Sequence, residues 1–184
     1  MRYISTRNHL ISLSLSDAIQ KGLSSDGGLF LPQALPMINT QEHLTDLSYP
    51  EFAFKMLKDF FKEDRLFSSL KGICENTFNF SVPLKQLDES TWVLELFHGP
   101  TCSFKDFGAC FLAECLSQIK TKKTTILVAT SGDTGSAVAN AFYLKSNYQV
   151  IILYPHGKVS SKQEHQMTCW DKNILSVSVD GSFD

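Results

Sequence analysis

The sequence lacks the features that mark membrane-spanning, secreted or strongly charged chains. None of its 184 residues lies in an apolar run approaching the roughly 20 residues that cross a bilayer. The amino-terminal residues 1–10 are followed by neither an apolar run nor a small-residue cleavage site, so they do not indicate a secretion signal. The net charge of −2 gives no reason to expect nucleic acid or an anionic membrane as a partner. We therefore expect a cytoplasmic protein.

The sequence also lacks the usual spacings of metal and dinucleotide sites. Its five cysteines form an odd set with no C-x-x-C pair, which predicts reduced residues that pack in the interior and no bound metal. No G-x-G-x-x-G follows an apolar strand-like run, which argues against a dinucleotide-binding domain. The cysteines are Cys74, Cys102, Cys110, Cys115 and Cys169.

Helix signals dominate the first part of the chain, and we predict a mainly helical amino-terminal domain over residues 1–90. Ser16 is placed to cap a helix over 17–23, and Gly27 with Gly28 indicates a turn. Pro50 suits the first turn of an amphipathic helix that ends near residue 62, and a shorter helix is predicted over 66–76.

Residues 91–184 are predicted to form a parallel α/β domain. Strand-like apolar runs alternate with helical segments, a pattern typical of a parallel sheet with right-handed crossovers. Because the runs are apolar throughout, we expect helices on both faces of the sheet. The fold class is thus α/β, a helical leader followed by a parallel βαβαβαβ unit that looks incomplete at its carboxyl end. The predicted strands are 92–97, 124–130, 149–154 and 174–179, and the predicted helices are 104–120, 135–145 and 160–170.

One candidate site is the glycine-rich turn 131–135, which follows a predicted strand. Ligands of open α/β sheets bind at the carboxyl ends of strands. Backbone N–H groups and the positive end of the next helix favour an anion there, and the hydroxyls of Ser131 and Thr134 add donors. Asp133 can accept a hydrogen bond from a ligand hydroxyl or cap the helix. The alternative is a capped strand–helix turn that binds no ligand.

The second candidate is Lys105, at the start of the predicted helix 104–120. Its ammonium faces the positive end of the helix dipole, and Phe104 and Phe107 add apolar surroundings, so its charged form is disfavoured. A neutral lysine amine suits an imine with a carbonyl cofactor. The alternative is a surface lysine paired with Asp106.

Taken together, these segments resemble the threonine synthase family of fold-type II pyridoxal-phosphate enzymes. The resemblance runs in order along nearly the whole chain, so it is more specific than either site segment alone. It is carried by DGGLF at 26–30, LELFHGPT at 94–101, FKDFG at 104–108, ATSGDTG at 129–135 and ILYP with GKVS at 152–160.

The resemblance implies a reaction and a role for each candidate residue. The family converts O-phospho-L-homoserine and water to L-threonine and phosphate, and Lys105 corresponds to its Schiff-base lysine and proton carrier. Asp133 occupies a place where related enzymes often carry an asparagine that meets the ring hydroxyl of the cofactor. Thr101 and Lys158 are expected at the substrate phosphate, although Lys158 also fits a solvated loop lysine. The residues expected around the cofactor and the substrate carboxylate are Ser131, Gly132, Asp133, Thr134 and Gly135.

The resemblance also implies that the chain is an amino-terminal portion. No glycine-rich loop for the cofactor phosphate is found, although the family carries one later in its sequence. We therefore expect weak binding of pyridoxal phosphate and no turnover by this chain. The alternatives are another fold-type II lyase, such as a serine/threonine dehydratase, and a non-catalytic anion-binding fragment. The sequence does not predict an oligomeric state.

Overall fold

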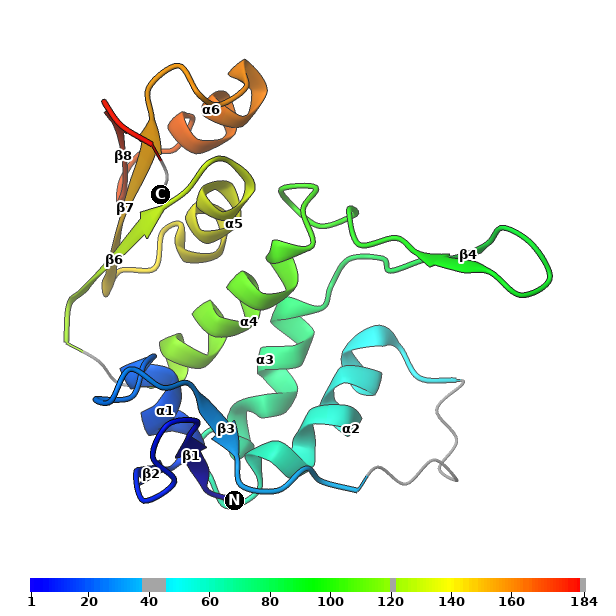
Figure 1. The fold of residues 1–184 in the computed structure, drawn as a ribbon. Coiled ribbons are helices and arrows are strands. Elements are labelled where there is room, and N and C mark those ends of the chain that lie inside the picture. Colours follow the sequence, from blue (N-terminus) through cyan, green and yellow to red (C-terminus); the bar gives the residue numbers. More distant parts are fainter. Residues whose placement is uncertain (38–45, 120–121, 183–184) are drawn as a thin grey trace. The chain divides into compact units, whose positions relative to one another are not determined.

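The computed structural model describes residues 1–37, 46–119 and 122–182 (Figure 1). The chain divides into two compact units, which are described separately below. The first comprises residues 1–79 with 114–120, and the second comprises 80–113 with 121–184. The predicted boundary near residue 90 stays a prediction. In the described part of the chain, no helix is long and apolar enough to cross a membrane.

The first unit contains a small antiparallel sheet that the sequence did not predict. Its strands are β1 (Tyr3–Ser5), β2 (Ser12–Leu13) and β3 (Phe30–Pro32), in the order β2-β1-β3. Strands of two or three residues are too short to show a period-2 pattern. The turn before β3 is fixed by Asp26, whose carboxylate accepts bonds from the Ser5 hydroxyl and the Gly28 N–H. The Gly28 bond holds the pKa of Asp26 below its ordinary value.

The first helix begins two residues earlier than predicted. Helix α1 spans Leu15–Lys21, and its cap is Ser14, whose hydroxyl accepts the Asp17 N–H at 3.2 Å. The prediction that Ser16 caps this helix is wrong, because Ser16 is buried inside the first turn. Its N–H and hydroxyl both donate to the carboxylate of Asp64, at 2.9 and 3.0 Å.

The two longer helices of this unit follow the sequence signals more closely. Helix α2 spans Tyr49–Phe61 with Pro50 in its first turn, as predicted, and Ser48 and Glu51 form a capping box. The predicted helix 66–76 is a 3-10 turn, η1 (Phe67–Ser69), that runs into α3 (Leu70–Thr77). The core of the unit also receives the carboxyl-terminal end of α4 (Lys105–Gln118). The buried core side chains include Phe61, Leu66, Leu70, Ile73, Cys74 and Cys115.

The five cysteines are all free thiols, but they are not all interior residues. Cys74 and Cys115 are fully buried, and burial raises the pKa of these thiols to about 11 and about 12. Cys102 and Cys169 are exposed, so the prediction that every cysteine packs inside is wrong for these two. Each follows a turn or a helix end, where apolar spacing gives no burial signal.

This difference predicts two classes of thiol reactivity. At pH 8, Cys102 and Cys169 should react with a neutral disulfide reagent at least about tenfold faster than Cys74 and Cys115. Only the thiolate attacks, and burial both disfavours the thiolates of Cys74 and Cys115 and keeps the reagent from them. Peptide mapping after timed quenching measures the labelling of each cysteine. In denaturant all five should react alike. Equal rates in the folded chain would contradict the burial of Cys74 in α3 and of Cys115 in α4.

The second unit is built on a three-stranded parallel sheet. Its strands are β6 (Thr124–Ala129), β7 (Tyr148–Pro155) and β8 (Ile174–Val179), in the order β6-β7-β8. The helices α5 (Asp133–Phe142) and α6 (Ser161–Thr168) connect them and lie on the same side of the sheet (Figure 1). In register, Val150 lies between Ile126 and Ile174. The parallel α/β arrangement is thus confirmed for these three strands.

The other face of this sheet is open among the described residues, contrary to prediction. Val150 and Ile152 of β7 are fully buried, whereas Leu127 of β6 is 65% exposed and Leu175 of β8 is 50% exposed. Apolar runs led us to expect helices on both faces, but α5 and α6 cover only one. The strands therefore alternate between covered and uncovered side chains.

The predicted strand 92–97 does not join the parallel sheet. Only β5 (Trp92–Leu94) forms, and it pairs antiparallel with β4 (Leu84–Gln86) in an exposed two-stranded hairpin. The carboxylate of Asp88 accepts the N–H groups of Ser90 and Thr91 and so fixes the connecting turn. The parallel part is therefore βαβαβ rather than βαβαβαβ, because the first apolar run pairs with β4 across a local turn.

Candidate active site

The turn between β6 and α5 is organised by a residue that sequence reasoning did not single out. The buried hydroxyl of Thr130 accepts the N–H groups of Gly132 at 3.0 Å and Gly135 at 3.2 Å. Two of the amides expected to bind an anion are therefore used inside the turn. A threonine followed by glycines at the second and fifth positions is the sequence signal that would have indicated this turn.

The remaining donors of the turn lie at the start of α5. Ser131, Asp133 and Thr134 are exposed. Asp133 and Thr134 belong to the first helical turn, where N–H groups have no acceptor within the helix. This end of α5 therefore retains the polar character expected of an anion site, with fewer amides than the sequence suggested.

Lys105 is the first residue of α4, and its nearest charged partner comes from α5. Its Nζ lies 3.9 Å from a carboxylate oxygen of Asp133 and 4.5 Å from the centroid of the Phe104 ring. The side chain is 32% exposed. The structure thus joins the two candidate segments, although Lys105 follows a loop rather than a strand of the parallel sheet.

Asp106 is not the partner of Lys105, contrary to the alternative drawn from the sequence. It is fully buried, and its carboxylate accepts the Thr101 N–H at 2.9 Å and the Thr101 hydroxyl at 2.6 Å. A Cβ on Gly99 would lie 2.6 Å from the same carboxylate, so only glycine allows the loop to approach this closely. Asp106 therefore fixes the loop that precedes Lys105.

An open cavity of about 490 Å³ lies beside Lys105, a volume typical of small-molecule sites. Lys105 and Thr134 supply its polar groups. The rest of the lining is mainly apolar and comes from the first half of α4, from the residue just before it and from α5. The apolar lining includes Phe104, Phe107, Leu112, Ala137 and Val138.

The two residues predicted at the substrate phosphate do not line this cavity. The Thr101 hydroxyl donates to Asp106, as described above. Lys158 follows β7, and its Nζ donates to the carbonyl oxygen of Gly181 at 2.9 Å. Their roles stay predictions.

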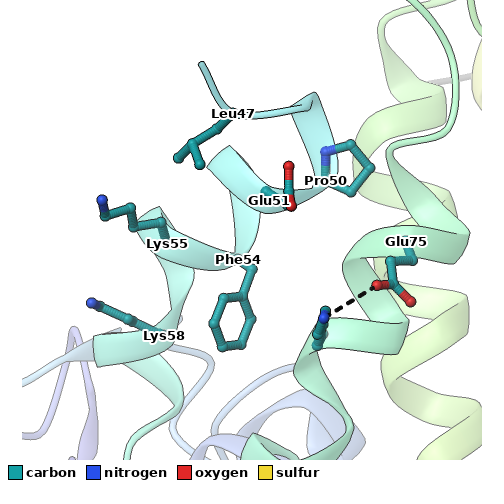
Figure 2. Close-up of a pocket in the computed structure, with 8 residues that line it drawn as sticks. Leu47, Pro50, Glu51, Phe54, Lys55, Lys58 and Glu75 are labelled. Carbon is teal, nitrogen blue, oxygen red and sulfur yellow. Dashed lines mark ion pairs between the residues drawn. The ribbon is translucent and has the colours of Figure 1, made fainter. Parts of the chain in front are cut away.

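A second cavity, of about 310 Å³, lies in the first unit between α2 and α3 (Figure 2). Phe54 points from α2 toward α3, and Lys55 and Lys58 extend from the same helix. Glu75 pairs with Lys71 at 4.0 Å, and Glu51 serves the α2 capping box. None of the predicted site residues lines this cavity.

Comparison with known proteins assigns the chain to a class of enzymes. Residues 78–184 match the family described as pyridoxal-phosphate dependent enzyme, and the chain belongs to this family. Residues 2–78 match the family described as threonine synthase N terminus. The two matches together span the chain from residue 2 to its last residue.

The curated relatives and solved structures narrow the similarity to threonine synthases. The threonine synthase of Haemophilus influenzae is 42% identical over 173 residues, which cover 94% of this chain and 41% of that protein. The crystal structure of threonine synthase from Escherichia coli superposes with a TM-score of 0.90 at 38% identity and 100% coverage of this chain. The structure of threonine synthase from Brucella melitensis with bound pyridoxal phosphate gives 0.92 at 37% identity, again covering 100% of this chain. The chain spans 44% and 42% of the lengths of those two chains.

Proposed function

We propose that this chain is the lysine-bearing, amino-terminal portion of a threonine synthase. The proposed reaction converts O-phospho-L-homoserine and water to L-threonine and phosphate. The observation that carries the proposal is the 3.9 Å approach of Asp133 to Lys105, which lines a mainly apolar cavity, in a chain whose relatives are threonine synthases. The chain spans less than half the length of these relatives.

The side chains at this site fit pyridoxal phosphate. The group needs a lysine amine for its aldehyde, an acceptor for its ring hydroxyl and apolar walls for its ring. Lys105, the Asp133 carboxylate and the cavity beside α4 supply these three features. When bound, the cofactor supplies an electron sink for chemistry at the substrate Cα.

In this proposal each residue of the site has a defined task. Lys105 holds the cofactor covalently and then carries the proton to and from the substrate Cα. Asp133 accepts a hydrogen bond from the ring hydroxyl. The exposed residues Ser131, just before α5, and Thr134, in its first turn, bind the substrate carboxylate together with the N–H groups that Thr130 does not accept.

The first test combines an absorbance titration with a turnover assay. Pyridoxal phosphate added to the purified chain should produce a visible band that borohydride removes, because the reactive amine is presented by this part of the protein. The chain should release no phosphate from O-phospho-L-homoserine. Phosphate release in proportion to chain concentration would contradict the predicted inactivity, and the absence of any band at saturating cofactor would contradict the proposed lysine site.

A further inference from the structure

We infer that Gln163 is a positioning residue whose side-chain amide fixes the Asp133 carboxylate beside Lys105. The inference rests on the proposed function for its chemical purpose. In that function the Asp133 carboxylate must face both the lysine amine and a cofactor hydroxyl, and a fixed orientation allows it to do so. The contact itself involves only residues of this chain. It can therefore be tested without the cofactor.

The two oxygens of Asp133 have different partners. The Nε2 of Gln163 donates to Oδ1 at 3.0 Å, while Oδ2 lies 3.9 Å from the Nζ of Lys105. An exposed ion pair of this length contributes little by itself and does not hold a carboxylate in one orientation. The hydrogen bond from the Gln163 side-chain amide constrains the orientation of the carboxylate, because Nε2 is a donor and Asp133 must accept from it.

The orientation of the Gln163 amide is fixed from its other end. Its Oε1 accepts the Ser160 hydroxyl at 2.9 Å and faces the Ser160 N–H at 3.4 Å, which completes the capping box of α6. With the oxygen engaged at Ser160, the nitrogen is left to face Asp133. Gln163 therefore links the start of α6 to the carboxylate beside Lys105.

Gly132 provides the space for this contact. A Cβ at position 132 would lie 2.5 Å from the Nε2 of Gln163 and 2.8 Å from its Cδ, and the backbone φ of 154° also disfavours a side chain. The glycine in the turn thus permits the amide to cross from α6 to α5. This accounts for Gly132 by a contact within the protein.

The substitution Gln163→Glu separates the role of Gln163 in the helix from its role at the site. Glutamate is as suitable as glutamine at this position of a capping box, so α6 keeps its cap. The amide donor is replaced by a carboxylate facing Asp133, and the two carboxylates repel. The swap of Asp133→Asn with Gln163→Glu restores a donor and an acceptor and the charge of the pair. Gln166→Glu adds the same charge elsewhere on α6 and serves as the control.

The readout is the reactivity of Lys105 in the 184-residue chain without cofactor. Trace acetic anhydride at pH 8 acetylates lysine amines, and peptide mass spectrometry gives the rate at Lys105 relative to the exposed Lys85. Gln163→Glu should slow this relative rate by about threefold or more, because a second carboxylate stabilises the unreactive ammonium. The swap should return it to at least the wild-type value, and Gln166→Glu should leave it within about 1.5-fold, since the charge is not added at the amide that contacts Asp133.

An unchanged relative rate in Gln163→Glu, or a swap chain as slow as Gln163→Glu, would overturn the inference, as would equal slowing by Gln166→Glu. If Gln163→Glu does not fold, a folded swap chain labelled at or above the wild-type rate supports the contact, and an unfolded or more slowly labelled swap chain contradicts it. Because no cofactor is used, failure of the chain to take up pyridoxal phosphate would count against the proposed function alone.

Discussion

After reduction with borohydride, the Lys105→Ala chain should carry no covalent pyridoxal-phosphate adduct above the level of scattered surface labelling. The substitution removes the lysine amine that lines the apolar cavity, so the aldehyde has no nucleophile at the proposed site of the ring. We expect at least about a tenfold loss of adduct at limiting cofactor, because a positioned amine has a large advantage in effective concentration over free ones. Absorbance of the reduced product per chain measures the loss.

Two matched variants show whether the loss is specific. Lys105→Arg keeps a positive charge near Asp133 but presents no amine for the aldehyde, so it should lose the adduct equally. Lys85→Ala removes an exposed lysine from the β4 strand and should keep the wild-type amount. Retention of the adduct in Lys105→Ala, or an equal loss in Lys85→Ala, would show that another lysine reacts.

The Gly135→Ala chain should lose about 1–3 kcal/mol of unfolding free energy, the range usual for overpacking a core. A Cβ at this position would lie 2.6 Å from the Thr130 Cγ2 and 3.0 Å from both the Ile152 Cγ2 and the Met167 Sδ. These atoms belong to the β6–α5 turn, to β7 and to α6, so α5 would have to move away from the sheet. The turn that presents Asp133 would shift with it.

Urea unfolding followed by circular dichroism measures this loss, with Gly108→Ala as the matched control. Gly108 is also a helical glycine, but beyond its own stretch of helix no atom of the described residues lies within 4 Å of the Cβ that alanine would add. Alanine there should leave stability unchanged or raise it by up to about 1 kcal/mol through helix propensity. If Gly135→Ala were as stable as the wild type, the close packing of α5 on β7 would be wrong.

The parallel strands were predictable because each is a largely apolar run, rich in β-branched residues and bounded by turn residues. The strand Ile174–Val179 was predicted with its observed bounds, and the strand Tyr148–Pro155 extends the prediction by one residue at each end. Ser160 correctly marked the start of α6, where its hydroxyl and Gln163 form the capping box. In these segments local composition and tertiary packing favour the same structure.

The run at 92–97 was mispredicted because an apolar run does not specify its neighbour. Its first residues satisfy their backbone groups with β4 across a turn held by Asp88. The short strands of the first unit escaped prediction for a related reason. Their pairing joins segments far apart in sequence, such as Tyr3 with Pro32, which no local pattern reveals.

The sequence indicated Lys105 and Asp133 as candidate site residues, and their roles stay predictions, but it did not indicate the contacts around them. Lys105 and Asp133 were chosen from local chemistry and from the family resemblance, and the structure brings them together. The contact of Gln163 with Asp133 spans 30 residues of sequence and depends on the packing of α6 against α5. The buried pairing of Asp106 with Thr101 was missed because an aspartate beside a lysine suggests an exposed ion pair.

The most direct test of the account is to map the adduct to a residue. The wild-type chain is mixed with limiting pyridoxal phosphate, reduced with borohydride and digested, and the labelled peptides are identified by mass spectrometry. We predict that the label lies mainly on the peptide that contains Lys105. Label spread over the exposed lysines, or concentrated on a lysine other than Lys105, would contradict it.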